Sequence, residues 1–257
     1  MTLSYIFSGF AVGALVGLTG VGGGSLMTPL LTLLFGVSPT VAVGTDLAFA
    51  STTKAAGTLA HRMRGTIRWD VVRHLCMGAL PAALLATLAL KYFGALDKEI
   101  GKVIRYSIAG SVLLTVVALL FKKRMLTWIT AHPEKQLGGT RLAVATILVG
   151  TLLGTLVTIS SIGAGAIGAT ILVLLYPRMS PAEIAGTDIA YAVPLTAIAA
   201  LGHWWLGSIN WELLATLLLG SLPGITIGSL AAKAIPEKFL RGLLATTLTG
   251  VAAKMVF

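Results

Sequence analysis

The chain is poor in charged residues, especially acidic ones, and nearly free of cysteine. Of its 257 residues, 11% are charged, with 19 basic and 9 acidic, and one is a cysteine. An ordinary soluble domain has about 25% charged residues. With 56% hydrophobic residues and a mean hydropathy of +0.92, the composition indicates a polytopic membrane protein. The single Cys76 excludes an intrachain disulfide and a cysteine-based metal cluster.

Other signals are missing as well. The opening MTLSYIFSGF has no Lys or Arg, so it lacks the basic region of a signal peptide, and we expect the first apolar segment to be retained. No His, Cys or carboxylate cluster has metal-ligand spacing, and no nucleophile, base and orienting residue form a catalytic set. We therefore expect no metal, no cofactor and no enzymatic activity. The net charge of +10 comes mostly from short loops, which favours membrane topology over nucleic-acid binding.

Long apolar runs fill the chain, and their length suits transmembrane helices. Five runs precede a basic stretch and five follow it: 3–22, 25–36, 39–60, 69–93, 99–121, then 141–159, 161–176, 181–202, 211–234 and 238–256. This order predicts an all-α polytopic membrane protein. Residues 1–121 would form a first transmembrane repeat, 122–140 a basic cytoplasmic linker, and 141–257 a second transmembrane repeat.

The two halves are related in sequence. GTDLAFA (residues 44–50) recurs as GTDIAYA (residues 186–192), HRMRGTIRW recurs as HWWLGSINW, and GALPA recurs as GSLPG. The first loop of this pattern, 61–74, carries four arginines, whereas its counterpart at 203–212 has no Lys or Arg. The positive-inside rule places the two loops on opposite sides of the membrane. We therefore predict two inverted-topology repeats of about five helical segments each, with the substrate site at their interface.

Glycine-rich motifs interrupt the apolar runs at corresponding places. GVGGGSL starts at residue 20 and SIGAGAI at residue 161, and each stands before a segment that is short for a full span. One interpretation is close helix packing through small residues. The other is a broken helix whose free N–H groups line an anion site. In that case the motifs supply the contacts to substrate, from Gly22, Gly23, Gly24, Ser25, Ser161, Gly163 and Gly165.

Two carboxylates, Asp46 and Asp188, lie well inside apolar runs. A charge there costs several kcal/mol and by default marks a functional site. Ser-Pro pairs lie seven to eight residues upstream and are typical of helix starts, which places each aspartate about two turns into its helix. We predict that Asp46 and Asp188 carry a coupling proton and that, with Thr45 and Thr187, they contact the substrate. The alternative is that the aspartates only brace broken backbone.

Three further polar residues are candidates for the same region. Lys54 follows Asp46 by eight residues, so both could border one cavity, with Lys54 as anion ligand or counter-ion. Lys54 could equally extend to the cytoplasmic surface. His61 and His203 end corresponding segments and would lie either at the membrane interface or at the site.

The motifs GVGGGSLMTPLL and SPTVAVGTDLAF, and their recurrence in the second half, resemble the sulfite exporter TauE/SafE family of bacterial membrane proteins over essentially the full length. The family usually has G-T-S where this chain has GTD, at Asp46 and Asp188, and usually keeps GGG where this chain has Gly163, Ala164 and Gly165. The chain therefore looks like an aspartate-bearing branch.

The resemblance implies a multi-pass secondary transporter in the bacterial inner membrane. Its substrate would be a small anion, an oxidised sulfur compound such as sulfite, sulfoacetate or a related sulfonate, and its partners would be this anion and membrane lipid, not nucleic acid. A dimer stays open. The alternative function is a cation-coupled carrier or channel for another small substrate, in which the carboxylates bind a cation. A structural subunit is disfavoured because intramembrane carboxylates are costly to keep without use.

Overall fold

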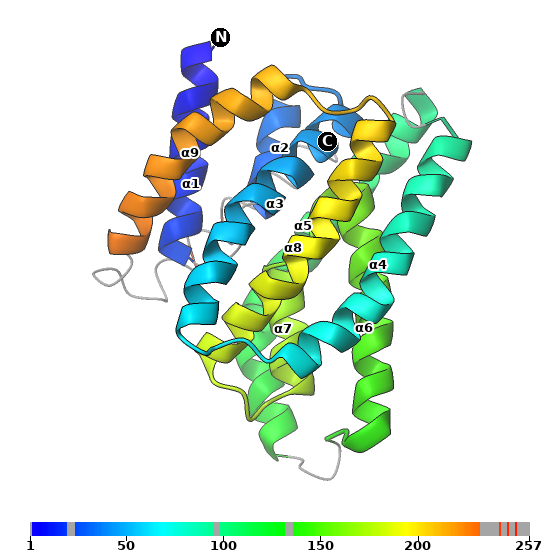
Figure 1. Cartoon of the computed structure of the whole chain (residues 1–257), viewed down its shortest axis with the longest axis vertical. Coiled ribbons are helices and arrows are strands. Elements are labelled where there is room, and N and C mark those ends of the chain that lie inside the picture. Colours follow the sequence, from blue (N-terminus) through cyan, green and yellow to red (C-terminus); the bar gives the residue numbers. More distant parts are fainter. Residues whose placement is uncertain are drawn as a thin grey trace.

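The computed structural model describes residues 2–19, 24–94, 98–131 and 136–231, together with Gly242, Thr246 and Gly250. In these ranges every regular element is a helix (Figure 1), which confirms the predicted all-α class. The helices are α1 (Thr2–Thr19), α2 (Gly24–Leu34), α3 (Pro39–Met63), α4 (Trp69–Tyr92), α5 (Lys98–Ala131), α6 (Gly139–Ser160), α7 (Ala166–Leu175), α8 (Pro181–Trp205) and α9 (Trp211–Ala231). The predicted last segment, 238–256, lies almost wholly outside the described residues.

Several helices are long and apolar enough to cross a membrane. In the described ranges there are five such spans: Trp69–Tyr92, Glu99–Lys122, Gly139–Ser160, Pro181–Trp205 and Trp211–Gly228. Helix α3 is equally long but less apolar, because it carries Asp46 and Lys54. Both of these side chains are buried in the protein, so they face other helices and not lipid. The arrangement is that of a multi-pass membrane protein.

Helix α5 differs from the sequence prediction. The apolar run was expected to end at residue 121, followed by a linker, but the helix continues to Ala131. The apolar part does end there, since the membrane-length window stops at Lys122. The next residues, KKRML, are good helix formers, so the helix continues beyond the apolar segment.

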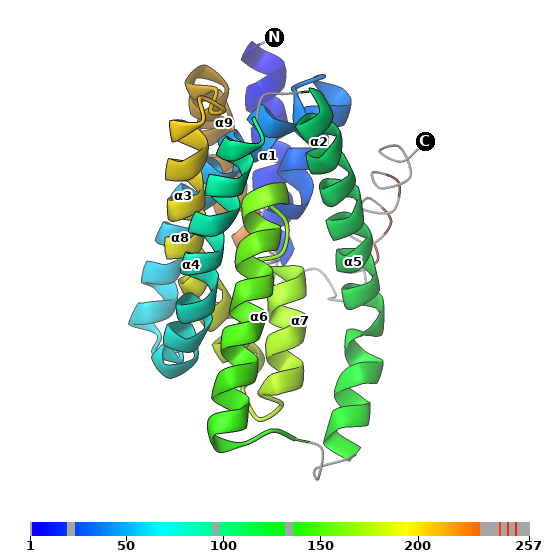
Figure 2. The ribbon, with the colours of Figure 1, turned by 90° about the vertical axis from the view of Figure 1, so that its right-hand side faces the viewer.

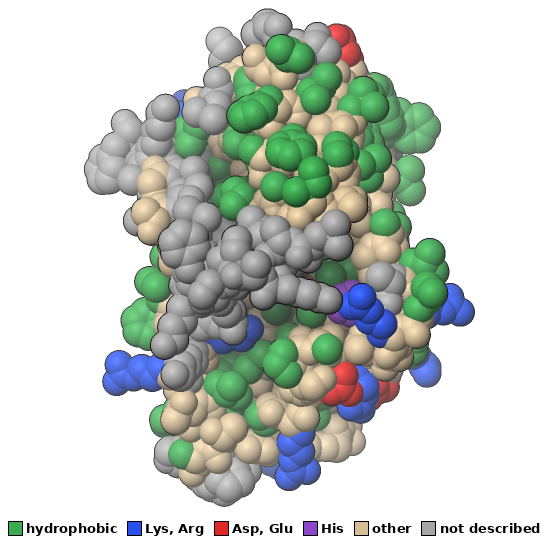
Figure 3. Space-filling view, turned by 90° about the vertical axis from the view of Figure 1, so that its left-hand side faces the viewer, with side chains coloured by type: hydrophobic (Ala, Val, Ile, Leu, Met, Phe, Trp, Pro, Cys, Tyr) green, Lys and Arg blue, Asp and Glu red, His purple; other side chains and the backbone are tan. Residues whose placement is uncertain are grey.

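Helices α3 and α8 lie side by side at the centre of the molecule (Figure 1). Two closely packed pairs, α1 with α9 and α4 with α6, lie around them, and α5 packs against α7 (Figure 2). Most Lys and Arg side chains visible in Figure 3 lie in the lower half of that face, towards the end where the α3–α4 loop and the start of α6 are found. This distribution agrees with a cytoplasmic position for that end.

Equivalent residues of the two halves make reciprocal contacts. Thr45 Oγ1 accepts a hydrogen bond from Asn210 N–H at 3.1 Å, and Thr187 Oγ1 accepts one from Arg68 N–H at 3.0 Å. Thr187 is the equivalent of Thr45, and Asn210 is the equivalent of Arg68, both at a shift of 142 positions (187 minus 45, and 210 minus 68). Each half therefore makes the same contact to the other. Reciprocity of this kind is typical of a two-fold interface. It also requires α3 and α8 to run antiparallel. The contacts agree with an internal repeat, and its inverted membrane topology stays a prediction.

Glycines of the recurring GALPA and GSLPG motifs lie where the flanking helix pairs cross. A Cβ at Gly78 of α4 would lie 2.7 Å from Thr151 N of α6, and a Cβ at Gly220 of α9 would lie 2.8 Å from Phe10 N of α1. Small residues let membrane helices approach to backbone contact. These recurring glycines therefore set the packing of the two pairs.

Substitution of Gly78 by alanine should destabilise the protein. The new methyl group would overlap the backbone of α6, and overpacking of this kind costs about 1–3 kcal/mol. Gly57→Ala is the matched control, because its Cβ would meet Ile189 Cγ2 at an ordinary 3.6 Å. Thermal unfolding of the purified proteins in detergent measures the difference. Equal transition temperatures for the two variants would contradict the proposed packing role.

Candidate substrate site

The second glycine-rich motif forms a break between α6 and α7. Helix α6 ends at Ser160, and Ser161 adopts the left-handed conformation with φ of 59°. Gly163 and Gly165 follow with φ of 140° and 130°, angles that glycine adopts most readily. Helix α7 then begins at Ala166 and has 10 residues, too few to cross a membrane. The motif is thus a broken helix, as one of the two sequence interpretations predicted.

Serine side chains hold the break in place. Ser160 Oγ lies 3.1 Å from Ser111 Oγ of α5 and accepts a hydrogen bond from Ile162 N–H at 3.2 Å. The equivalent first motif is described only in part, since Gly22 and Gly23 lie outside the described residues. Helix α2 begins at Gly24 and runs for 11 residues, so it is as short as the sequence predicted. Ser25 lies in its first turn.

Asp46 lies in α3 opposite the short helix α2 and is fully buried. Thr28 of α2 donates a hydrogen bond from Oγ1 to Asp46 Oδ2 at 2.5 Å. Ser161, at the α6–α7 break, lies beside the carboxylate. Within the described residues, neither Asp46 Oδ1 nor Ser161 Oγ has a hydrogen-bond partner. Asp46 therefore joins α2, α3 and the break, and leaves polar atoms available there.

Asp188 lies in α8 at the N-terminal end of α7. It is 4% exposed and faces the backbone N–H of Gly165. Its Oδ1 lies over Gly168, and the buried Tyr191 OH lies over the same glycine. In the described part of the chain, both atoms lack a hydrogen-bond partner. The second carboxylate thus also lies at a helix break with an unused oxygen.

Lys54 connects the two carboxylates electrostatically. It is buried, and its Nζ donates a hydrogen bond to the Ala164 carbonyl oxygen, within the break, at 3.2 Å. Its ammonium group lies within electrostatic range of both Asp188 and Asp46. Among the described ion pairs, none within 4.0 Å joins Lys54 to either carboxylate. Lys54 therefore points into the protein. It does not extend to the cytoplasmic surface, which was the alternative from the sequence.

The remaining sequence candidates contact loops between helices. Thr45 and Thr187 accept the backbone hydrogen bonds of the opposite half described above. His203 is buried, with Nδ1 2.9 Å from Ser208 Oγ and Nε2 3.0 Å from the Thr158 carbonyl oxygen. His61 is half-buried, with Nδ1 2.8 Å from Thr66 Oγ1. Each histidine thus holds the turn that follows its own helix, and His203 does so from a position buried within the protein.

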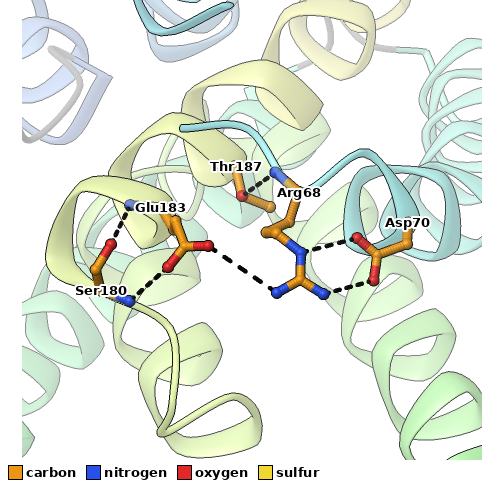
Figure 4. Close-up of polar contacts among 5 residues, drawn as sticks. All are labelled: Arg68, Asp70, Ser180, Glu183 and Thr187. Carbon is orange, nitrogen blue, oxygen red and sulfur yellow. Dashed lines mark hydrogen bonds and ion pairs between the residues drawn. The ribbon is translucent and has the colours of Figure 1, made fainter. Parts of the chain in front are cut away.

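A charged cluster lies at the N-terminal end of α8 (Figure 4). Arg68 makes two hydrogen bonds to Asp70, at 3.3 and 3.1 Å, and reaches Glu183 at 4.0 Å. Glu183 and Ser180 form a capping box, which satisfies the first backbone N–H groups of α8. The hydrogen bonds that the Arg68 guanidinium donates to Asp70 raise its pKa above the usual value. Arg68 is therefore always charged, and it ties the α3–α4 loop to α8.

A cavity of about 510 Å³ opens beside this cluster. Arg68, Glu183, Arg178 and Tyr176 are among its lining residues, and Arg68 N–H binds the residue directly before Asp188. The cavity thus lies on the side of the molecule from which α8 leads to the buried carboxylate. Sequence patterns could not predict this cavity, because its walls come from four separate segments of the chain.

Apolar helices of membrane length around a buried cation, two buried carboxylates and a helix break define a multi-pass membrane transporter. The chain belongs to the sulfite exporter TauE/SafE family, whose model matches residues 5–255.

Among similar curated proteins, the probable membrane transporter protein YjnA of Bacillus subtilis is 36% identical over 263 residues and covers 100% of both chains. YdhB of the same organism, also a probable membrane transporter protein, is 27% identical over 93% of both chains. A probable membrane transporter protein of Xylella fastidiosa is 28% identical over 88% of this chain and 83% of its own. No solved structure gave a significant match. The family and these relatives are described as transporters, not enzymes.

Proposed function

We propose that the chain is a proton-coupled secondary transporter for a small anion in the bacterial inner membrane. The substrate would be an oxidised sulfur compound, such as sulfite, sulfoacetate or a related sulfonate. The observation that carries the proposal is Lys54, a buried ammonium group on the Ala164 carbonyl of a broken helix. A buried cation beside unwound backbone is a suitable anchor for an anion, because both offer hydrogen-bond donors away from competing water.

The anion would lie between Lys54 and the two glycine-rich motifs. Lys54 Nζ has three N–H donors, and within the described residues one of them is used, on the Ala164 carbonyl oxygen, so donors are left there for a ligand. Ser161 offers a hydroxyl at the break, beside the Asp46 carboxylate. Backbone N–H groups of Gly163, Gly165 and the first motif would complete the site. Thr45 and Thr187 would position α3 and α8 around it through their loop contacts.

The charges of the site support proton coupling. Asp46 and Asp188 carry two negative charges when ionised, and Lys54 carries one positive charge. An entering anion would add to the excess of negative charge in a region of low dielectric constant, where such an excess is costly. Uptake of a proton by one carboxylate offsets that cost and links anion binding to protonation. The reciprocal contacts of α3 and α8 support alternating access by movement of one half against the other.

A thermal-shift screen tests the substrate class. Sulfite, thiosulfate, sulfonates and carboxylates are added to the purified protein at two pH values. A ligand that binds only the folded state stabilises it, by about 2.7 kcal/mol at a hundredfold excess over Kd. We expect stabilisation by sulfite or a sulfonate, greater at the lower pH, and none by carboxylates. Stabilisation by sodium ions without any response to sulfur anions would instead support a cation-coupled carrier.

A further inference from the structure

The two buried carboxylates have different partners. Thr28 donates a hydrogen bond to Asp46 at 2.5 Å, and a donor to a carboxylate favours its ionised form. The residue equivalent to Thr28 in the second motif is Ala169, at a shift of 141 positions (169 minus 28), and alanine has no hydroxyl. Among the described residues, Asp188 therefore lacks the side-chain donor that Asp46 has.

Helix α7 has a glycine where Asp188 and Tyr191 meet it. A Cβ at Gly168 would overlap Asp188 Oδ1, and it would lie 2.9 Å from Tyr191 OH and 3.4 Å from the Gly163 carbonyl oxygen. Tyr191 is fully buried, and its OH and Asp188 Oδ1 both lack partners within the described residues. Buried polar atoms are rarely left unpaired, and those that are need a functional or chemical explanation. Phe49 takes the place of Tyr191 in the first half, so this hydroxyl occurs once.

Charged and titratable groups approach this pair from three other helices. Lys54 and Asp46 lie on α3, and Lys122 of α5 is within electrostatic range of Asp188. Cys76 of α4 lies within range of Tyr191. Helix α7 has no titratable side chain and contributes only backbone groups. A single proton on one of the two carboxylates makes the group formed by Asp46, Lys54 and Asp188 neutral.

We propose that Asp188 is the carboxylate that binds the proton, that Tyr191 OH donates a hydrogen bond to it, and that Asp46 stays ionised as counter-ion of Lys54. Tyr191 is thus a positioning residue that holds the protonated Asp188 over Gly168. The inference rests on the proposed function only where it assigns the transport proton to Asp188. The proton site itself exists with or without a sulfur substrate.

Infrared difference spectroscopy tests the proposal without any substrate. Purified full-length protein is titrated with acid, and the C=O band of buried protonated carboxyl groups is recorded in H₂O and D₂O. Asp188→Asn should remove the band that appears at mildly acidic pH, and Asp46→Asn should retain it. Tyr191→Phe should move that band to higher wavenumber, because the C=O loses a hydrogen-bond donor. Phe49→Tyr, which adds a hydroxyl on the Asp46 side, should leave it in place.

Three outcomes would overturn the proposal. They are loss of the band in Asp46→Asn, an unmoved band in Tyr191→Phe, and loss of the band when sodium ions are added at constant ionic strength. The last would identify a cation site in place of a proton site. Gly168→Ala gives a second check, since its methyl group should displace Asp188 and shift the same band. If the band is normal but the protein does not bind sulfite, the proposed substrate is wrong and the proposed proton site is unaffected.

Discussion

Replacement of Lys54 by threonine is expected to lower sulfite uptake into proteoliposomes by about a hundredfold. Thr196 occupies the equivalent position of the second half. Threonine is therefore a residue that the repeat already has at this place in its helix. A hydrogen bond to a charged group contributes about 1.5–3 kcal/mol, and each 1.4 kcal/mol is about tenfold in affinity. Uptake of labelled sulfite at a subsaturating concentration measures the loss.

Two controls separate this effect from misfolding and from loss of charge in general. Lys54→Thr leaves Asp46 and Asp188 without their cation, and an unbalanced buried charge destabilises a protein strongly, by about 3–5 kcal/mol. The double variant Lys54→Thr with Asp46→Asn removes the counter-ion together with the cation and should fold yet still fail to take up sulfite. Lys91→Thr removes a lysine that lies over the Trp205 ring at 3.1 Å, outside the site, and should transport normally. Undiminished uptake by Lys54→Thr would show that the anion binds elsewhere.

Replacement of Asp188 by asparagine should abolish concentrative transport and preserve exchange. Asparagine has nearly the shape of a protonated aspartate but cannot release a proton. Protein with this change should therefore bind the anion and exchange internal for external sulfite. Under a pH gradient at zero membrane potential, its internal sulfite should only reach the external concentration, whereas the wild type accumulates it.

Asp70→Asn is the matched control for this change. Asp70 pairs with Arg68 at the surface, and its side chain is 58% exposed. Exposed ion pairs contribute little to stability, so accumulation should be retained. If Asp188→Asn accumulated sulfite as the wild type does, the coupling role of Asp188 would be refuted. Loss of both exchange and accumulation would instead assign Asp188 to anion binding.

Much of the fold could be predicted because it depends on local signals. Ser180 before Pro181 indicated a helix start, and the structure has Ser180 as N-cap of α8 with a capping box to Glu183. The placement of Asp188 about two turns into α8 followed from that start. The end of α5 was predicted too early, at residue 121, because hydropathy marks the end of an apolar segment and not the end of a helix.

The partners of the carboxylates were harder to predict. Thr28 is one threonine in an apolar run, and nothing in its spacing marks it as a donor to Asp46, a residue 18 positions away. Tyr191 could have been found, since it is the polar difference between GTDIAYA and GTDLAFA. His61 and His203 each stand five positions before the hydroxyl that they contact, on Thr66 and Ser208. That recurring spacing could have predicted a turn contact for both histidines.

The most direct measurement is accumulation of sulfite by the wild-type protein in liposomes under an imposed pH gradient. The account predicts that internal sulfite rises above the external concentration while the gradient lasts, and that dissipation of the gradient by a protonophore releases the excess. Accumulation that follows a sodium gradient and not the pH gradient would contradict proton coupling. A current that follows a cation gradient and is indifferent to sulfite and sulfonates would contradict the anion transporter itself.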